Sequence, residues 1–425
     1  MVARDRLLPW AVGLVPALAV IARTPEVSPD TASYLANSSS RPPVYPLLLD
    51  LASVLPAPVE LRAVIAAQVL LTVWGAVRLA RWFARSVGTS RLTEALVVLV
   101  AAMPAVLLGT WVLTDVLAYA LLLHAVVPLL EALRTRAARP LIEAATLLAL
   151  ATMTRPHYLF AVPPLLAVAG ALLMWRRRAA VASVALSIAI LLAIGPVQRL
   201  YHLAASGEAR SSSLLGIQLL TVAAYVSAPE DAAAVQDTAA RALTSEVLAA
   251  IRAEGLTPEQ AVHSLSPYSH FRAVYNDICW GIVVPRWKAA HAPDRRSTLD
   301  DLDAMNRATT GAALDLFRAH PLRLLAHMGR QLQAAEGLLL VLFAAFLLVA
   351  ATRAVASRGR DPYWTAALAV GLLHACNLCL VVLVEPPMPR YTFPTGTLLV
   401  VTLLAGLARS ASLPPAGSTP LEGTT

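Results

Sequence analysis

The sequence predicts an all-α polytopic membrane protein, and three observations support this fold class. Of the 425 residues, 58% are hydrophobic and only 14% are charged, and the mean hydropathy is +0.65, well outside the range of soluble domains. Apolar runs of helix-spanning length recur along the chain. Short arginine-rich runs separate them, so the net charge of +8 reflects membrane topology and does not indicate a nucleic-acid-binding face.

The apolar runs predict about ten transmembrane helices, because a spanning helix needs about 20 mainly apolar residues. The ten candidate spans are approximately residues 7–22, 60–79, 92–111, 116–133, 140–154, 157–175, 179–196, 336–352, 363–384 and 391–408.

The arginines predict the direction of these spans. If the N-terminus is cytoplasmic, the cytoplasmic connections are rich in arginine and the short outer connections are poor in it, as the positive-inside rule requires. The first span could also be a cleaved signal peptide, but the 23–59 loop is extracytoplasmic under either interpretation. The arginines of the predicted cytoplasmic side are Arg4, Arg6, Arg81, Arg85, Arg91, Arg134, Arg136, Arg139, Arg176, Arg177, Arg178, Arg353, Arg358 and Arg360.

The spans divide the chain into four regions. Residues 1–196 form an N-terminal transmembrane module of about seven spans, and residues 336–408 form a C-terminal module of about three. Residues 197–335 are less apolar and have helical patterning, which predicts a small helical extracytoplasmic domain. The end of this domain, "FRAHPLRLLAHMGRQLQAAEG", is amphipathic and is expected to lie along the membrane interface. Residues 409–425 are predicted to form a disordered cytoplasmic tail.

The cysteines and the histidines of the extracytoplasmic domain predict packing rather than chemistry. Cys279, Cys376 and Cys379 are too few for a disulfide framework. Cys376 and Cys379 have CxxC spacing but lie in an apolar run, where small residues let helices approach closely. Histidines 263, 270 and 291 have no recognisable metal-ligand spacing.

Polar and aromatic residues gather in four turns on the predicted outer face. Ionisable groups near a bilayer are costly unless they are paired or used. The carboxylates can accept a proton, arginine forks match phosphate oxygens, and the rings suit a sugar or an isoprenoid. The candidate residues are Asp30, Tyr34, Arg41, Tyr45, Asp115, Arg155, His157, Glu385, Arg390 and Tyr391.

Structural alternatives exist for several of these residues. Asp115 could cap a helix N-terminus, where its charge suits the helix dipole. Arg155 and Arg390 could be interface anchors with snorkelling stems. The Pro-rich stretches could be plain helix-ending turns.

Six short motifs resemble the GT-C integral membrane glycosyltransferases, and the similarity extends over residues 7–408. The nearest pattern is that of the protein O-mannosyltransferase and aminoarabinose transferase type, together with bacterial homologues that use polyprenyl-phosphate sugars. The motifs are "PDTASYL", "RPPVYPLLL", "TDVLAYALLL", "TRPHYLFAVPPLL", "HPLRLLAHM" and "PRYTFPTGTLLV".

The resemblance implies a GT-C-like fold with juxtamembrane helices within residues 44–56. It also implies that Asp30 is the catalytic carboxylate, that Arg41 lies near the carrier phosphate, and that Arg390 and Tyr391 surround the donor. One position departs from the family, because many relatives have Asp-Glu where this chain has Asp30 followed by Thr31. The missing acid puts metal coordination in doubt; a divalent metal stays possible, and Asp115 could supply a second carboxylate.

The expected reaction is transfer of a sugar from a polyprenyl-phosphate donor to a hydroxyl of an extracytoplasmic glycan, glycolipid or protein at the plasma membrane, with inversion. Asp30 is expected to act as general base. Arg41, Arg155 and Arg390 are expected to stabilise charge on the departing phosphate. Tyr34, Tyr45, His157 and Glu385 are expected to contact the substrates. No nucleotide sugar is required, and no Rossmann-type glycine loop is evident in the sequence.

Two other classes of protein remain open from the sequence. A transporter or lipid-linked sugar flippase would also gather arginines near one membrane face, and His124, Glu143 and His374 within the spans favour this alternative. Such a protein should show inverted repeats or broken helices at the midplane, and no convincing repeat is evident. A non-catalytic scaffold is the third possibility, and it would not need Asp30, Arg41 and Arg390 together.

Overall fold

The computed structural model describes residues 2–36, 38, 41–175, 177–209, 214–260, 267–291 and 299–412. Within these ranges the regular structure is helical, apart from one isolated bridge between Glu26 and Trp111. The predicted all-α membrane fold class is therefore confirmed. Of the predicted tail, residues 413–425 lie outside the described residues, and the last helix continues to Ser412.

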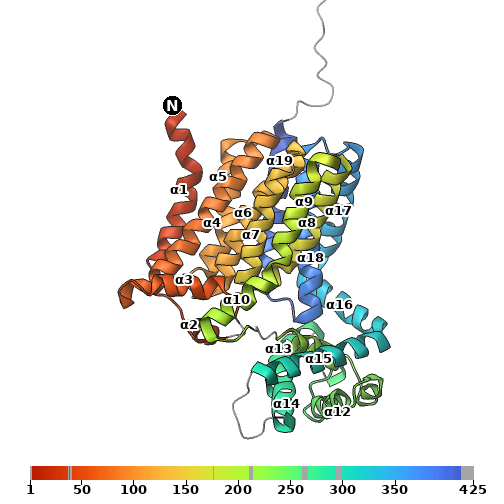
Figure 1. The fold of residues 1–425 in the computed structure, drawn as a ribbon. Helices are drawn as coiled ribbons and strands as arrows, with labels where there is room; N and C mark the ends of the chain where they lie inside the picture. The colour runs from red at the N-terminus through yellow and green to blue at the C-terminus, as the bar shows by residue number, and fades with distance from the viewer. Residues whose placement is uncertain are drawn as a thin grey trace, which may run out of the picture.

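The helices of the membrane part run side by side (Figure 1). In the described ranges, eight helical segments are long and apolar enough to cross a membrane. The other two predicted spans are also helical but shorter: the apolar part of the first helix covers Leu7–Ile21, and the fifth span has 16 residues. The helices of this bundle are α1 (Val2–Ile21), α4 (Ala57–Val87), α5 (Arg91–Leu108), α6 (Thr114–Thr135), α7 (Arg139–Thr154), η1 (Pro156–Ala161), α8 (Val162–Trp175), α9 (Arg177–Leu192), α10 (Ile194–Ser206), α17 (Leu338–Ala356), α18 (Pro362–Val384) and α19 (Pro389–Ser412).

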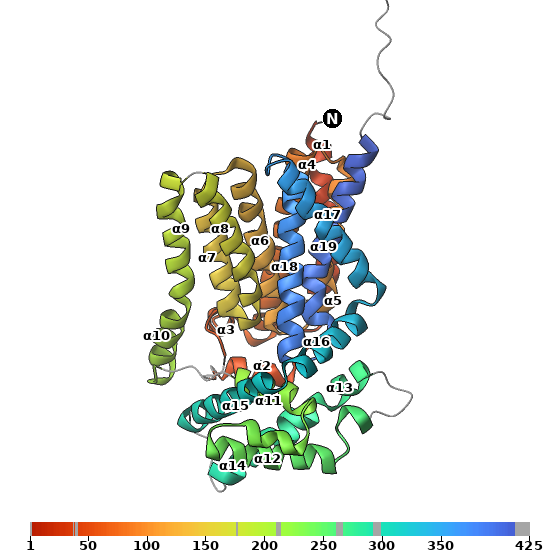
Figure 2. The same cartoon turned by 90° about the vertical axis from the view of Figure 1, so that its right-hand side faces the viewer.

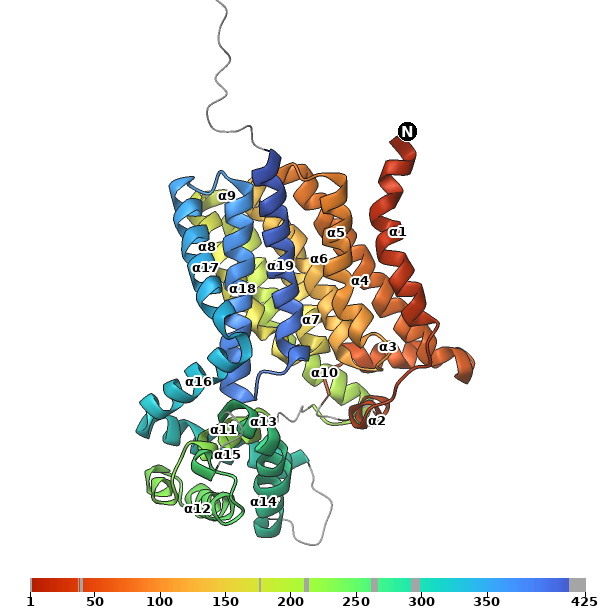
Figure 3. The ribbon, with the colours of Figure 1, turned by 180° about the vertical axis from the view of Figure 1, so that it is seen from behind.

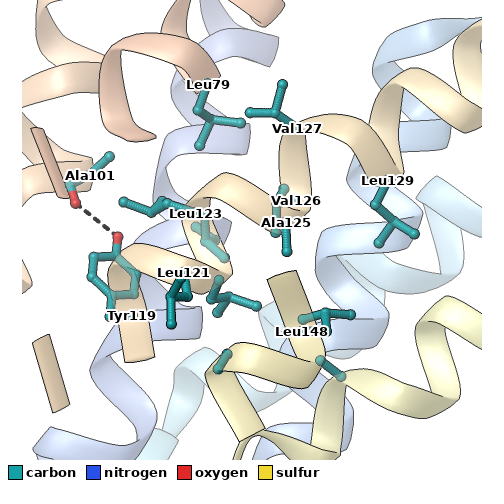
Figure 4. Close-up of a cluster of buried hydrophobic side chains, with 14 of the residues drawn as sticks. Leu79, Ala101, Tyr119, Leu121, Leu123, Ala125, Val126, Val127, Leu129 and Leu148 are labelled. Carbon is teal, nitrogen blue, oxygen red and sulfur yellow. Dashed lines mark hydrogen bonds between the residues drawn. The ribbon is translucent and has the colours of Figure 1, made fainter. Parts of the chain in front are cut away.

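Helix α6 lies at the centre of the bundle, and nearly all of its side chains are buried. It packs between α4 and α7. A close approach to α4 requires Gly75, because a Cβ atom there would lie 2.9 Å from the Cβ of Leu123. Figure 4 shows the surrounding apolar side chains and the hydroxyl of Tyr119, which donates a hydrogen bond of 2.8 Å to the carbonyl oxygen of Ala101. The central helix is thus fixed by packing and by one buried polar contact.

Replacing Tyr119 with phenylalanine is expected to lower the free energy of unfolding by about 1 kcal/mol, because the buried carbonyl of Ala101 loses its side-chain donor. Thermal unfolding of the purified protein in detergent measures the effect. The ring and its packing are retained, so an unchanged unfolding temperature would show that this hydrogen bond contributes nothing.

A layer of shorter helices covers one end of the bundle, while α1 begins and α19 ends at the other (Figures 1, 2 and 3). Two belong to the first loop, and the rest form a domain with its own apolar core. They are α2 (Pro29–Leu35), α3 (Val44–Ala52), α11 (Leu215–Tyr225), η2 (Pro229–Ala234), α12 (Thr238–Ala253), η3 (Pro258–Gln260), α13 (Pro267–Asn276), η4 (Asp277–Val283), α14 (Val284–His291), α15 (Leu299–Ala319) and α16 (Pro321–Glu336).

The boundaries of this domain differ slightly from those expected. Helix α10 continues the seventh span to Ser206, ten residues beyond the expected boundary at 196. At the other boundary, α16 ends at Glu336, and the chain turns sharply at Gly337, whose φ of 54° and ψ of −131° suit glycine. Leu322 and Leu325 are exposed on α16, which favours the expected position along the membrane interface.

Most of the arginines used to predict topology belong to helix ends and turns on the side of the bundle where α1 begins and α19 ends (Figure 1). Position 176 falls outside the described residues, and so does His263. The other two histidines of that group pack locally: His270 Nδ1 lies 3.0 Å from the Tyr225 hydroxyl, and the His291 ring stacks on Trp287 at 3.7 Å. Cys279, Cys376 and Cys379 are free thiols.

Candidate active site

The first loop is attached to the connection between α5 and α6 by backbone and side-chain hydrogen bonds. Glu26 exchanges backbone hydrogen bonds with Thr110 (2.7 Å) and Val112 (2.9 Å). Thr31 is fully buried, and its hydroxyl donates to the carbonyl of Val112 at 3.0 Å. Thr31 therefore has a structural role, because its side chain holds the loop and does not reach solvent.

Asp30, next to Thr31 in α2, forms an ion pair with Arg41, which lies between α2 and α3. Arg41 Nη2 donates to Asp30 Oδ1 at 2.6 Å, and Arg41 Nε donates to the Ser33 hydroxyl at 2.7 Å. The Arg41 guanidinium also lies over the Tyr34 ring, 4.5 Å from its centroid. The Asp30 side chain is 47% exposed and the Arg41 side chain is 23% exposed. The Asp30 carboxylate is therefore the more accessible member of the pair.

Two tyrosines pack next to this ion pair. The rings of Tyr34 and Tyr45 pack edge to face, 5.2 Å apart. Tyr45 lies in α3, which begins directly after Pro42-Pro43, and its buried hydroxyl has no hydrogen-bond partner among the described residues. Burial raises the pKa of Tyr45, and Tyr34 and Asp115 nearby act in the same direction. Tyr45 therefore stays a neutral phenol that can still form a hydrogen bond.

A second ion pair lies deeper, between α6 and the end of α7. Arg155 Nη1 donates to Asp115 Oδ2 at 2.7 Å, and the Asp115 side chain is only 5% exposed. Burial opposes the charge of Arg155, but Asp115 and nearby tyrosines raise the pKa of Arg155 above its ordinary value. Asp115 is in the first turn of α6, as the capping alternative requires, but its carboxylate contacts Arg155. Its main task is to hold this guanidinium.

Thr114 connects the two ion pairs. Its hydroxyl lies 3.4 Å from the Tyr34 hydroxyl and accepts a hydrogen bond of 3.2 Å from Arg155 Nη1. Thr114 is not among the residues predicted from the sequence, although it directly precedes Asp115 in the "TDVLAYALLL" motif. Because threonine is common at helix starts, its position alone could not distinguish a capping role from a role in the site.

Tyr391, at the start of α19, lies close to two arginines. The guanidinium groups of Arg155 and Arg390 lie 5.0 and 4.7 Å from the centroid of the Tyr391 ring. Arg390 Nη2 also donates to the Tyr391 hydroxyl at 2.6 Å, while the buried Arg390 Nε has no hydrogen-bond partner in the described part of the chain. A buried guanidinium N–H without an acceptor is costly, so Arg390 is suited to bind an anionic oxygen.

Glu385 completes the charged set. It is 7% exposed and ends α18. Burial raises the pKa of the Glu385 carboxyl, while Arg155, a hydrogen bond from Tyr391 and Arg390 oppose this change.

The raised pKa of Glu385 predicts a pH-dependent contribution to stability. The folded protein holds the proton more tightly than the unfolded chain, so the contribution is present at low pH and decreases as pH rises through the raised pKa. Comparing the unfolding temperatures of the wild type and Glu385→Gln across pH 4–8 isolates this carboxyl. The advantage of the wild type over the variant should decrease towards pH 8, and a constant difference would contradict the prediction.

The last predicted residue, His157, joins the same cluster through its ring. Its centroid lies 5.4 Å from that of Tyr391, and its Nε2 lies 2.7 Å from Asn377 Oδ1. Asn377, in the middle of the apolar α18, was not selected from the sequence. A polar amide within a spanning helix is the signal that could have identified it.

All ten predicted residues thus lie in one connected cluster, contributed by the first loop, the starts of α6 and η1, and the α18–α19 turn. The described part of the chain contains no group of three His, Cys, Asp or Glu side chains suited to a metal ion. This arrangement can bind an anion with its arginines and accept a proton at the accessible carboxylate.

No family pattern and no characterised protein matches the sequence. Among solved structures, the chain is similar to the crystal structure of ArnT from Cupriavidus metallidurans in the apo state, with 14% sequence identity and a TM-score of 0.32, over 95% of this chain and 76% of that one. At that TM-score the likeness decides neither fold nor function, which rest on the residues of this chain.

Proposed function

We propose that this multi-pass membrane protein is a glycosyltransferase of the GT-C type. It moves a sugar from a polyprenyl-phosphate donor to a hydroxyl of an extracytoplasmic glycan, glycolipid or protein of a bacterial cell envelope. The observation that carries the proposal is the single cluster of three arginines, three carboxyl groups and three tyrosines at the end of the bundle where the first loop and the helical domain lie.

The arginines of the cluster match the phosphate of the donor. Arg155 is held by Asp115, and Arg390 carries a buried N–H that has no acceptor within the described ranges. Arg41 can exchange its contact with Asp30 for a phosphate oxygen, because this ion pair lies at the accessible side of the cluster. Guanidinium groups positioned before the reaction stabilise the negative charge that develops on the leaving phosphate.

Asp30 is the general base of the proposed reaction. The acceptor oxygen forms a bond to the anomeric carbon from the face opposite the phosphate, and the bond from that carbon to the phosphate oxygen breaks. The bonding electron pair leaves with the polyprenyl phosphate, while the acceptor proton passes to an Asp30 carboxylate oxygen. One displacement of this kind inverts the anomeric configuration. Asp115 stays paired with Arg155, because it is buried and away from solvent.

Reconstitution of the purified protein in liposomes tests the function. Polyprenyl-phosphate sugars and candidate hydroxyl acceptors are supplied together, and the expected result is a glycosylated acceptor with inverted configuration. Movement of the lipid-linked sugar across the bilayer without any glycosylated product would support the flippase alternative and overturn the proposal. Deleting the protein in cells and identifying the glycan or glycolipid that is lost identifies the acceptor.

A further inference from the structure

Asn377 makes three hydrogen bonds at the back of the candidate site. This fully buried residue of α18 donates from Nδ2 to the Tyr391 carbonyl and to the Thr395 hydroxyl, each at 2.8 Å. Its Oδ1 lies 2.7 Å from His157 Nε2. The Asn377 amide therefore connects the two sequence-distant turns that carry His157 and Tyr391.

These contacts determine which ring nitrogen of His157 carries the proton. A backbone carbonyl can only accept a hydrogen bond, so the amide nitrogen of Asn377 must face Tyr391 and its oxygen must face His157. That oxygen can also only accept, so Nε2 of His157 must be the N–H donor. In the neutral imidazole, Nδ1 is then an acceptor.

Further contacts keep the Asn377 amide from rotating. The Thr395 hydroxyl that it contacts is fully buried and also lies 2.9 Å from His374 Nδ1.

The Nδ1 atom of His157 lies on the other side of its ring from Asn377 and has no hydrogen-bond partner among the residues that the structure describes. The ring lies beside Tyr391, which in turn contacts Arg155 and Arg390.

We propose that Asn377 is a positioning residue that holds His157 in the Nε2–H tautomer, so that Nδ1 accepts a hydrogen bond from a hydroxyl of the donor sugar. The donor part of this inference rests on the proposed glycosyltransferase function. If the arginines around Tyr391 hold the phosphate, the adjacent imidazole is placed to contact the sugar attached to it. The sequence predicts His157 as a substrate contact, but it does not indicate the residue that sets the tautomer of His157.

The tautomer can be measured without any assay of activity. The full-length protein is labelled with ¹⁵N-histidine, placed in lipid nanodiscs and studied by magnetic resonance at neutral pH. The chain has nine histidines, and the signal missing from His157→Gln identifies His157. The expected spectrum shows a protonated Nε2 in the wild type and a mixture of tautomers in Asn377→Leu. A protonated Nδ1 in the wild type would overturn the inference.

The kinetic part of the test uses Asn377→Leu, Asn377→Asp and Thr395→Val. Asn377→Leu should raise the KM for the lipid-linked sugar by about tenfold, the effect of one lost hydrogen bond. Asn377→Asp retains an acceptor for Nε2–H and should recover part of the loss. Thr395→Val should have a smaller effect in the same direction. Thr402→Val is the matched control. It removes a buried hydroxyl of α19, the helix of Thr395, and within the described residues this hydroxyl bonds only to the Leu398 carbonyl of that helix.

The outcomes separate this inference from the proposed function. Wild-type donor kinetics in Asn377→Leu overturn the inference while leaving the transferase intact. Absence of transfer by the wild type with every donor tested overturns the proposed function, and the tautomer spectrum then decides the positioning role of Asn377 separately.

Discussion

Replacing Asp30 with asparagine is expected to lower the kcat of sugar transfer by about 10²- to 10⁴-fold, the usual contribution of a general base. The amide cannot take up the acceptor proton, but it can still accept the hydrogen bond from Arg41 Nη2. The loop should therefore keep its structure. The unfolding temperature and the KM for the lipid-linked sugar should change little, since the lost interaction is made in the transition state.

Asp50→Asn is the matched control for this variant, because Asp50 is an exposed carboxylate of α3 at the same end of the bundle. Its transfer rate should stay close to that of the wild type. Full activity in a folded Asp30→Asn variant would assign the base to another residue, while equal losses in both variants would indicate a general effect of charge at this surface.

Replacing Arg155 with methionine is expected to lower the free energy of unfolding by about 3–5 kcal/mol, the usual effect of breaking a buried ion pair. The cause is the Asp115 carboxylate, which is 5% exposed and would lose its charged partner at 2.7 Å. Transfer should also decrease by about 10²- to 10³-fold if Arg155 stabilises the departing phosphate. Chemical or thermal unfolding and the transfer assay measure the two effects.

The double variant Arg155→Met, Asp115→Leu separates stability from function. Removing both charges eliminates the unpaired carboxylate, so stability should return close to that of the wild type. Transfer should stay low, because the guanidinium is still absent. A double variant that is stable and fully active would show that the pair is structural only.

The sequence was sufficient to predict that the ten site residues lie at one end of the bundle, because this prediction needs only the number of spans. Each span reverses the direction of the chain, so Asp30, Asp115, Arg155 and Glu385 all fall at turns on the same side. The sequence was not sufficient to predict which of these side chains form ion pairs with each other. The pairing of Asp30 with Arg41 and of Asp115 with Arg155 depends on how the helices pack laterally.

Burial is the other property that the sequence did not reveal. Asp30 and Asp115 look equivalent as acids at turns, but one is accessible and the other is held against a guanidinium. Thr31 looks like a missing acid and is a buried hydrogen-bond donor to Val112. Asn377 looks like one polar residue in an apolar helix, and it contacts His157 and Tyr391 from a position that is distant from His157 in the sequence.

By itself, the sequence determined that the chain is a helical membrane protein and which turns share a face. Hydrophobicity and charge act along the bilayer normal, and they can be read from consecutive residues. Only the tertiary structure decided which side chains meet, which carboxylate stays accessible and which residues support the site. Those properties depend on the lateral packing of helices, which is decided by complementary surfaces of segments far apart in the chain.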